Sequence, residues 1–149
     1  MSAPDLSDPG FIEFLAKNAT PADRAKFGPY LRQVSLQAEM ERDYEAWLNG
    51  LFPAYVTAPL APHHHDLWRW IWALRRGISP ETFMAIWNRG GAKSTSAEMG
   101  CVAVGARRAR RYGLYICEVQ DQADDHVQNV GSMLESKEIA QAYPDCRTD

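Results

Sequence analysis

TFMAIWNRGGAKST, residues 82–95, is the stretch of this sequence that predicts a fold. Thr82–Trp87 is a short, mostly apolar run of the kind found in buried strands. The turn Asn88–Ala92 follows with two glycines, and a segment able to form a helix begins at Lys93. A strand, a Gly-rich turn and a helix beginning with Lys-Ser can bind the phosphates of a nucleotide. Glycines let backbone N–H groups converge on an anion, and the helix N-terminus adds its dipole.

The predicted phosphate-binding residues are Asn88, Arg89, Gly90, Gly91, Ala92, Lys93, Ser94 and Thr95. Lys93 is the expected phosphate lysine, and the hydroxyl of Ser94 is the expected Mg²⁺ ligand. The standard pattern has Gly six residues before the Lys and Gly immediately before it, where this chain has Trp87 and Ala92. An ordinary Gly-Gly turn between a strand and a helix is the alternative interpretation.

Composition indicates one globular domain. The chain has 149 residues, 46% of them hydrophobic and 23% charged, with a net charge of −3. A net negative charge argues against a chain that binds nucleic acid over its whole surface, although a local basic patch stays possible. We expect no secretory signal and no membrane span. The three widely spaced cysteines suit a reducing cytoplasm and match no zinc pattern.

The sequence predicts helices in the first part of the chain and alternating helices and strands in the rest. Residues 1–62 are expected to be a helical lead-in, with a helix from Pro21 to Gly28 and another from Pro29 to Asn49. Residues 63–149 are expected to alternate helices, 66–76, 94–105 and 122–134, with strands, 82–87 and 113–119. This order predicts an α/β fold with a parallel sheet unit after a helical N-terminal region.

Two polar clusters have open interpretations. His63–His65 can suggest a metal site, but adjacent residues point in different directions, so a surface or helix-capping role is favoured, with Asp66 near the start of the next helix. The arginines at 107, 108, 110 and 111 either form a solvated turn or contact nucleic acid or a partner.

Several blocks of the sequence resemble the large terminase subunit of tailed bacteriophages, the ATPase of the DNA-packaging motor. Asn88–Thr95 is similar to the deviant phosphate loop of that family, in which an Arg lies four residues before the Lys and Ala can precede the Lys. Tyr112–His126 is similar to the next family block, a strand leading into a helix. The sequences around Pro62–Trp68 and Tyr143-Pro144 are also typical of the family.

The resemblance implies the N-terminal part of an ASCE-type P-loop ATPase that binds ATP and Mg²⁺. It implies that Lys93 and Arg89 act on the phosphates, and that double-stranded DNA, other terminase subunits or the portal are partners in the bacterial host cytoplasm. In such ATPases, a later strand ends in acidic residues that hold the metal and activate water. No apolar strand after Lys93 ends in paired acids here. The sequence therefore supports ATP binding but does not supply both groups that hydrolysis requires, as expected of a fragment, a split gene or a prophage remnant.

Two other classes of function stay open from the sequence. One is a non-enzymatic module whose helical lead-in and arginine cluster bind another protein or DNA. The other is an unrelated small P-loop phosphotransferase.

Overall fold

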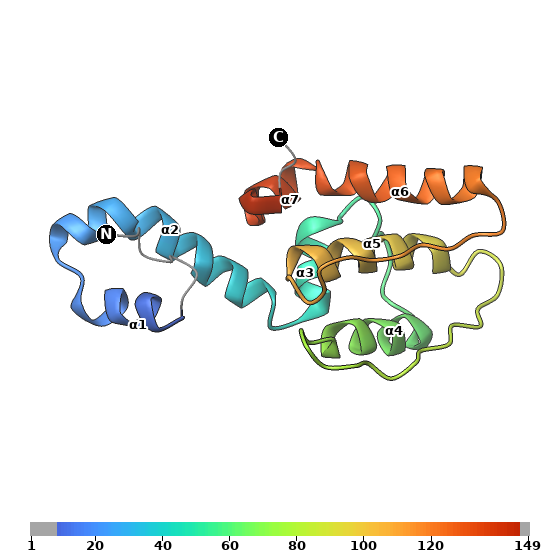
Figure 1. Ribbon diagram of the computed structural model, residues 1–149, viewed down its shortest axis with the longest axis horizontal. Helices are drawn as coiled ribbons and strands as arrows, with labels where there is room; N and C mark the ends of the chain where they lie inside the picture. The colour runs from blue at the N-terminus through green and yellow to red at the C-terminus, as the bar shows by residue number, and fades with distance from the viewer. Residues whose placement is uncertain (1–8, 147–149) are drawn as a thin grey trace. The chain divides into compact units, whose positions relative to one another are not determined.

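All the regular secondary structure in the described residues, 9–146 of a computed structural model, is helical (Figure 1). The chain divides into two units, whose described parts are 9–39 and 40–146. The elements are α1 Pro9–Asn18, α2 Pro21–Met40, α3 Tyr44–Leu51, α4 Pro62–Ala73, α5 Lys93–Ala106, α6 Gln120–Leu134, α7 Lys137–Ala142 and a short 3₁₀ turn, Pro144–Cys146. None of the described helices is long and apolar enough to cross a membrane.

In the first unit, the start of α2 is fixed by a reciprocal cap. The N–H of Thr20 donates to Asp23 Oδ2 at 3.0 Å, and the N–H of Asp23 donates to Thr20 Oγ1 at 3.2 Å. This confirms the predicted helix start. The predicted stop at Gly28 is wrong, because α2 continues through Pro29. Proline cannot donate the usual helical hydrogen bond, yet its φ is helical, so a helix can continue with one bond fewer.

In the second unit, α5 lies centrally and packs against both α4 and α6 (Figure 1). Gly100 allows α4 to approach closely, since a Cβ at this position would lie 2.8 Å from Ile71 Cδ1. The largest fully buried side chains are Trp47, Trp68, Leu48, Ile139 and Val102. The aromatic segment predicted as a core helix is therefore confirmed as α4, beginning at Pro62.

A chain of polar contacts joins the helices of the second unit around Glu41. The buried indole of Trp47 donates to the Tyr143 hydroxyl at 2.8 Å, and that hydroxyl donates to Glu41 Oε1 at 2.9 Å. The indole of Trp72 donates to the Glu41 carbonyl at 2.9 Å. Arg107 stacks 3.8 Å over the Trp72 ring, with Nε 3.9 Å from Glu41 Oε2. This network connects α3, α4, α7 and the C-terminal end of α5 to residue 41.

The predicted α/β fold with a parallel sheet, the ASCE-type P-loop arrangement, is wrong for this structure. Residues 82–87 and 113–119, predicted as strands, form no strand and no sheet in the described chain. Both segments nevertheless alternate in exposure: Met84 and Ile86 are exposed while Phe83 and Trp87 are half-buried. A strand requires a hydrogen-bonded neighbour, and the described chain offers none to either segment.

We expect Tyr143→Phe to destabilise the second unit by about 1–3 kcal/mol, because it leaves the buried Trp47 N–H without an acceptor. Urea unfolding followed by tryptophan fluorescence measures the effect. Tyr55→Phe is the matched control, since Tyr55 is exposed and no hydrogen bond of its hydroxyl is described. Equal stabilities of the two variants would contradict the role given to the Tyr143 hydroxyl.

The same hydroxyl predicts a loss of stability in alkali. Burial, and then the charge of Glu41, raise the pKa of Tyr143. Its contribution to stability is therefore complete below the ordinary tyrosine pKa of about 10 and is lost as pH rises above it. From about pH 10 upward, we expect the unfolding free energy of the wild type to fall more steeply than that of Tyr143→Phe. If the curves of unfolding free energy against pH were parallel for the two proteins, the pKa of Tyr143 would be the same in the folded and unfolded chains.

Candidate functional site

The loop before α5 contains two residues in the left-handed region of backbone conformation. Gly90 has φ +85° and Ala92 has φ +54°, so two residues near the start of α5 are left-handed. Ala92 occupies the helix N-cap without any side-chain hydrogen bond. Alternation of left- and right-handed residues turns successive N–H groups toward one side, which is how nests bind anions.

The first N–H groups of α5 are unoccupied by protein acceptors. Within the described chain, the N–H of Ser96 donates to the Ala92 carbonyl at 2.9 Å, but no acceptor is described for the N–H groups of Lys93, Ser94 and Thr95. A helix N-terminus with free N–H groups carries a partial positive charge. Lys93 and Arg89 are exposed beside it and add two full charges. The eight predicted residues thus form one continuous, mostly exposed basic turn.

His64 anchors this loop to α4. Its Nδ1 accepts the N–H of Ala61 at 3.0 Å, which leaves the proton of a neutral ring on Nε2. Nε2 lies 3.0 Å from the Gly91 carbonyl and donates to it. The rings of His63 and His64 also contact Trp87, at 4.6 and 5.0 Å between centroids. The start of α4 therefore holds both ends of the turn 88–91, a role that the sequence did not predict.

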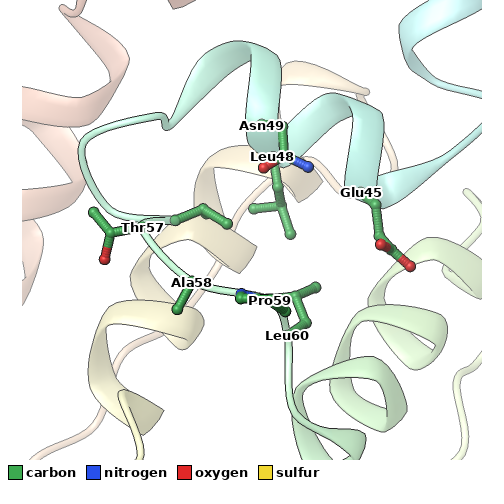
Figure 2. Close-up of a pocket in the computed structure, with 8 residues that line it drawn as sticks. Glu45, Leu48, Asn49, Thr57, Ala58, Pro59 and Leu60 are labelled. Atoms are coloured by element: carbon green, nitrogen blue, oxygen red, sulfur yellow. The ribbon is translucent and has the colours of Figure 1, made fainter.

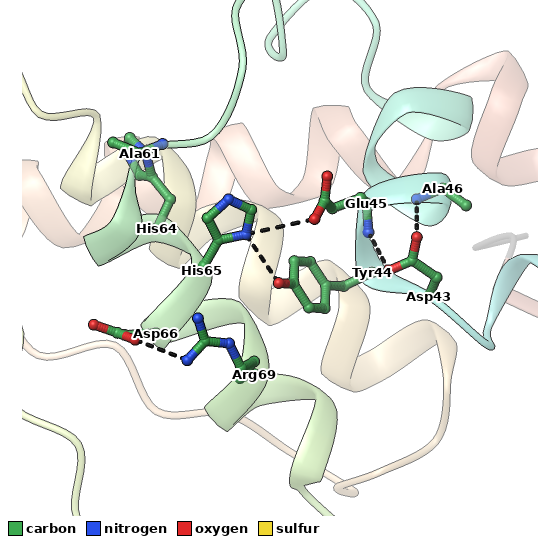
Figure 3. Close-up of polar contacts among 9 residues, drawn as sticks. All are labelled: Asp43, Tyr44, Glu45, Ala46, Ala61, His64, His65, Asp66 and Arg69. Carbon is green, nitrogen blue, oxygen red and sulfur yellow. Dashed lines mark hydrogen bonds and ion pairs between the residues drawn. The ribbon is translucent and has the colours of Figure 1, made fainter.

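The three adjacent histidines contact two sets of residues: His63 and His64 contact Trp87, and His65 contacts Tyr44 and Glu45. His65 contacts Tyr44, 2.9 Å from hydroxyl to Nδ1, and lies 3.5 Å from Glu45 (Figure 3). Among the described residues, no group of three histidine, cysteine or acidic side chains could hold a metal ion. Asp66 does not cap α4, since it lies inside the helix and pairs with Arg69 at 3.0 Å. His64 takes the capping role instead.

A second polar cluster, which the sequence analysis missed, joins α5 to α6. Glu98 is buried, and its Oε1 lies 2.6 Å from His126 Nδ1 and 3.0 Å from Asn129 Nδ2. The Tyr115 ring stacks on His126 at 4.5 Å. Burial and the nearby Glu98 raise the pKa of the Cys101 thiol, so this thiol is a poor nucleophile at neutral pH. A charged residue on the otherwise apolar face of α5 was the signal available in the sequence.

The predicted arginine cluster is partly used inside the protein. Arg107 is half-buried against Trp72 and Glu41, and Arg110 donates to the carbonyls of Arg75, Ile78 and Ala109. Arg108 and Arg111 are exposed. Two of the four guanidinium groups therefore hold backbone turns together rather than forming an open basic patch.

A separate hollow of about 350 Å³ lies between α3 and the connector that follows it (Figure 2). Leu48, Val56 and Leu60 are among its lining residues, and Glu45 is the one ionisable side chain in its lining. None of residues 88–95 lines it. It offers no cluster of reactive groups, so the basic turn before α5 is the better candidate site.

No protein-family model, curated protein or solved structure matches this chain.

We expect Ala92→Gly to stabilise the protein by about 1 kcal/mol, because glycine adopts a left-handed φ without the steric cost that alanine has. Ala97→Gly in the same helix is the control, and it should destabilise by about 0.5–1 kcal/mol. Chemical unfolding of both variants measures the difference. A destabilising effect of both substitutions would argue that residue 92 is not left-handed.

Proposed function

We propose that the chain binds the phosphates of ATP at residues 88–95, as the N-terminal part of a packaging ATPase of the terminase large subunit type. The observation that carries the proposal is the left-handed Ala92, followed by the free N–H groups of Lys93, Ser94 and Thr95. Position 92 is where the standard phosphate loop has glycine, the residue that most readily adopts this conformation.

Three groups of this chain would share the ligand. The N–H groups at the start of α5 would donate to phosphate oxygens, and the ammonium of Lys93 would neutralise their charge. Arg89, exposed on the same turn, would add a second cation. The exposed Ser94 hydroxyl fits one position on Mg²⁺, whose remaining ligands would come from phosphate oxygens and water. The proposal is for binding, since these residues do not include a group that activates water.

The terminase assignment depends on the sequence blocks around the loop, Asn88–Thr95 and Tyr112–His126. Under this proposal, the protein acts in the cytoplasm of a bacterial host with double-stranded DNA, other terminase subunits or the portal as partners. The His64 contact supports a functional loop because it fixes the position of the Gly91 carbonyl within the turn.

Titration calorimetry with ATP and Mg²⁺ tests the proposal. We expect Lys93→Ala to weaken binding at least about 10-fold, since a charge-assisted hydrogen bond contributes about 1.5–3 kcal/mol. Lys137→Ala, which removes an exposed lysine at the start of α7, is the matched control and should bind like the wild type.

Unchanged ATP binding by Lys93→Ala would place the nucleotide elsewhere, and no binding by the wild type would reject the proposed site. A phosphate-release assay run beside the calorimetry extends the test. Release by this chain would show that a catalytic acid exists outside residues 88–95.

A further inference from the structure

An apolar cleft of about 560 Å³ lies between α4, α5 and α6 and does not include the basic turn. Its lining includes Trp70 and Ile71 from α4, Cys101 and Val104 from α5, and Val127 and Val130 from α6. Exposing apolar surface to water in such a cleft costs free energy, roughly 25 cal/mol for each Å² of that surface. Concave sites lined mainly by apolar side chains are where ligands and partner side chains usually bind.

One wall of the cleft is the segment 111–118, which is extended but unpaired. Arg111, Tyr112, Gly113 and Tyr115 line the cleft. Side chains alternate along the segment: Leu114 and Ile116 are 79% and 80% exposed, while Tyr115 and Cys117 are half-buried. This is the two-residue period of a strand with one face packed on the protein.

The backbone of this segment has free hydrogen-bonding groups. No hydrogen bond to any N–H or carbonyl group of residues 111–118 is described. Free groups in an extended, apolar segment are the recognition surface of an edge strand. The segment Thr82–Trp87 shows the same alternation, with Met84 and Ile86 exposed at 76% and 84%.

The charges around the cleft all have one sign. Arg110 and Arg111 line it, and no carboxylate is among the lining residues. The guanidinium of Arg110 is held by backbone carbonyls, so its charge is not neutralised by an acid there. An occupant with an acidic group at the Arg111 end would therefore complement the cleft.

We propose that segment 111–118 and this cleft bind an extended segment of a partner protein by β-augmentation. The partner segment pairs with the free backbone groups, inserts aliphatic side chains at alternate positions into the cleft, and carries an acidic residue near Arg111. A small apolar ligand would fill the cleft but leave the backbone groups unpaired.

A second copy of this chain fits the cleft less well than such a partner. Tyr115 and Cys117 of a second copy would already be packed against its own helices. A second copy could therefore insert only the exposed, alternate side chains of its own segment 111–118 into the cleft. The proposal depends on this cleft and not on nucleotide binding at residues 88–95.

The test uses the whole chain and a pool of labelled synthetic peptides of about eight residues, the usual length of a strand. Each peptide has Val, Ile or Leu at alternate positions, Thr between them and Asp at one end. Fluorescence anisotropy should detect binding that falls at least about 10-fold when alternate peptide amides are N-methylated, because methylation removes the hydrogen-bond donors. Equal binding of methylated and unmethylated peptides, or no binding by the pool, would overturn the proposal.

Variants of the chain locate the site. Leu114→Asn should weaken peptide binding, whereas Leu36→Asn, at a leucine of similar exposure in the first unit, should not. Equal effects of the two substitutions would reject segment 111–118 as the pairing strand. Backbone amides of 112–117 should exchange rapidly in the free chain and slowly with bound peptide.

Sedimentation of the chain alone tests the second-copy alternative. We expect a monomer, with ATP binding unaffected by Leu114→Asn. A dimer that dissociates on this substitution would assign the cleft to a second copy and overturn the proposal.

Discussion

The structure of the second unit depends on the hydrogen bond from the Trp47 indole to Tyr143, extended to Glu41. Trp47 is fully buried and its N–H is polar, so leaving it without an acceptor would cost about 1–3 kcal/mol. Tyr143 supplies the acceptor from 96 residues further along the chain. Because Tyr143 must in turn donate, Glu41 completes the network, and Arg107 and Trp72 place the ends of α5 and α4 against it. The network thus links α3, α4, α5 and α7 to Glu41.

The helices follow from local sequence, which is why most of them could be predicted. Thr20 and Asp23 form the expected cap of α2, and the apolar and aromatic residues around Trp68 form the expected core helix. The predicted parallel sheet was wrong, because it depended on more than local sequence. Apolar runs such as Thr82–Trp87 have strand-like composition and strand-like alternation, but a strand also requires a partner in space. Composition alone cannot supply that partner, and the described chain does not contain it.

In the candidate site too, the features set by neighbouring residues could be predicted, whereas contacts between residues far apart in the sequence could not. The order of Gly90, Gly91 and Lys93 in sequence predicted a turn leading into a helix, and α5 begins at Lys93. His64 and the Glu98–His126 pair were not predicted because their partners lie 27 and 28 residues away. Adjacent histidines suggested metal binding or capping; in the structure His64 caps α4 and contacts the Gly91 carbonyl, while His65 contacts Tyr44.

The left-handed Ala92 connects the stability of the fold with the proposed binding of phosphate. Alanine at this φ raises the free energy of the folded chain by about 1–2 kcal/mol relative to a relaxed backbone. Glycine would remove that strain but would allow the turn many more conformations. A turn that is already held by Ala92, and by His64 at the Gly91 carbonyl, loses less entropy when an anion binds. The strained alanine is therefore consistent with a turn whose N–H groups are arranged before the ligand arrives.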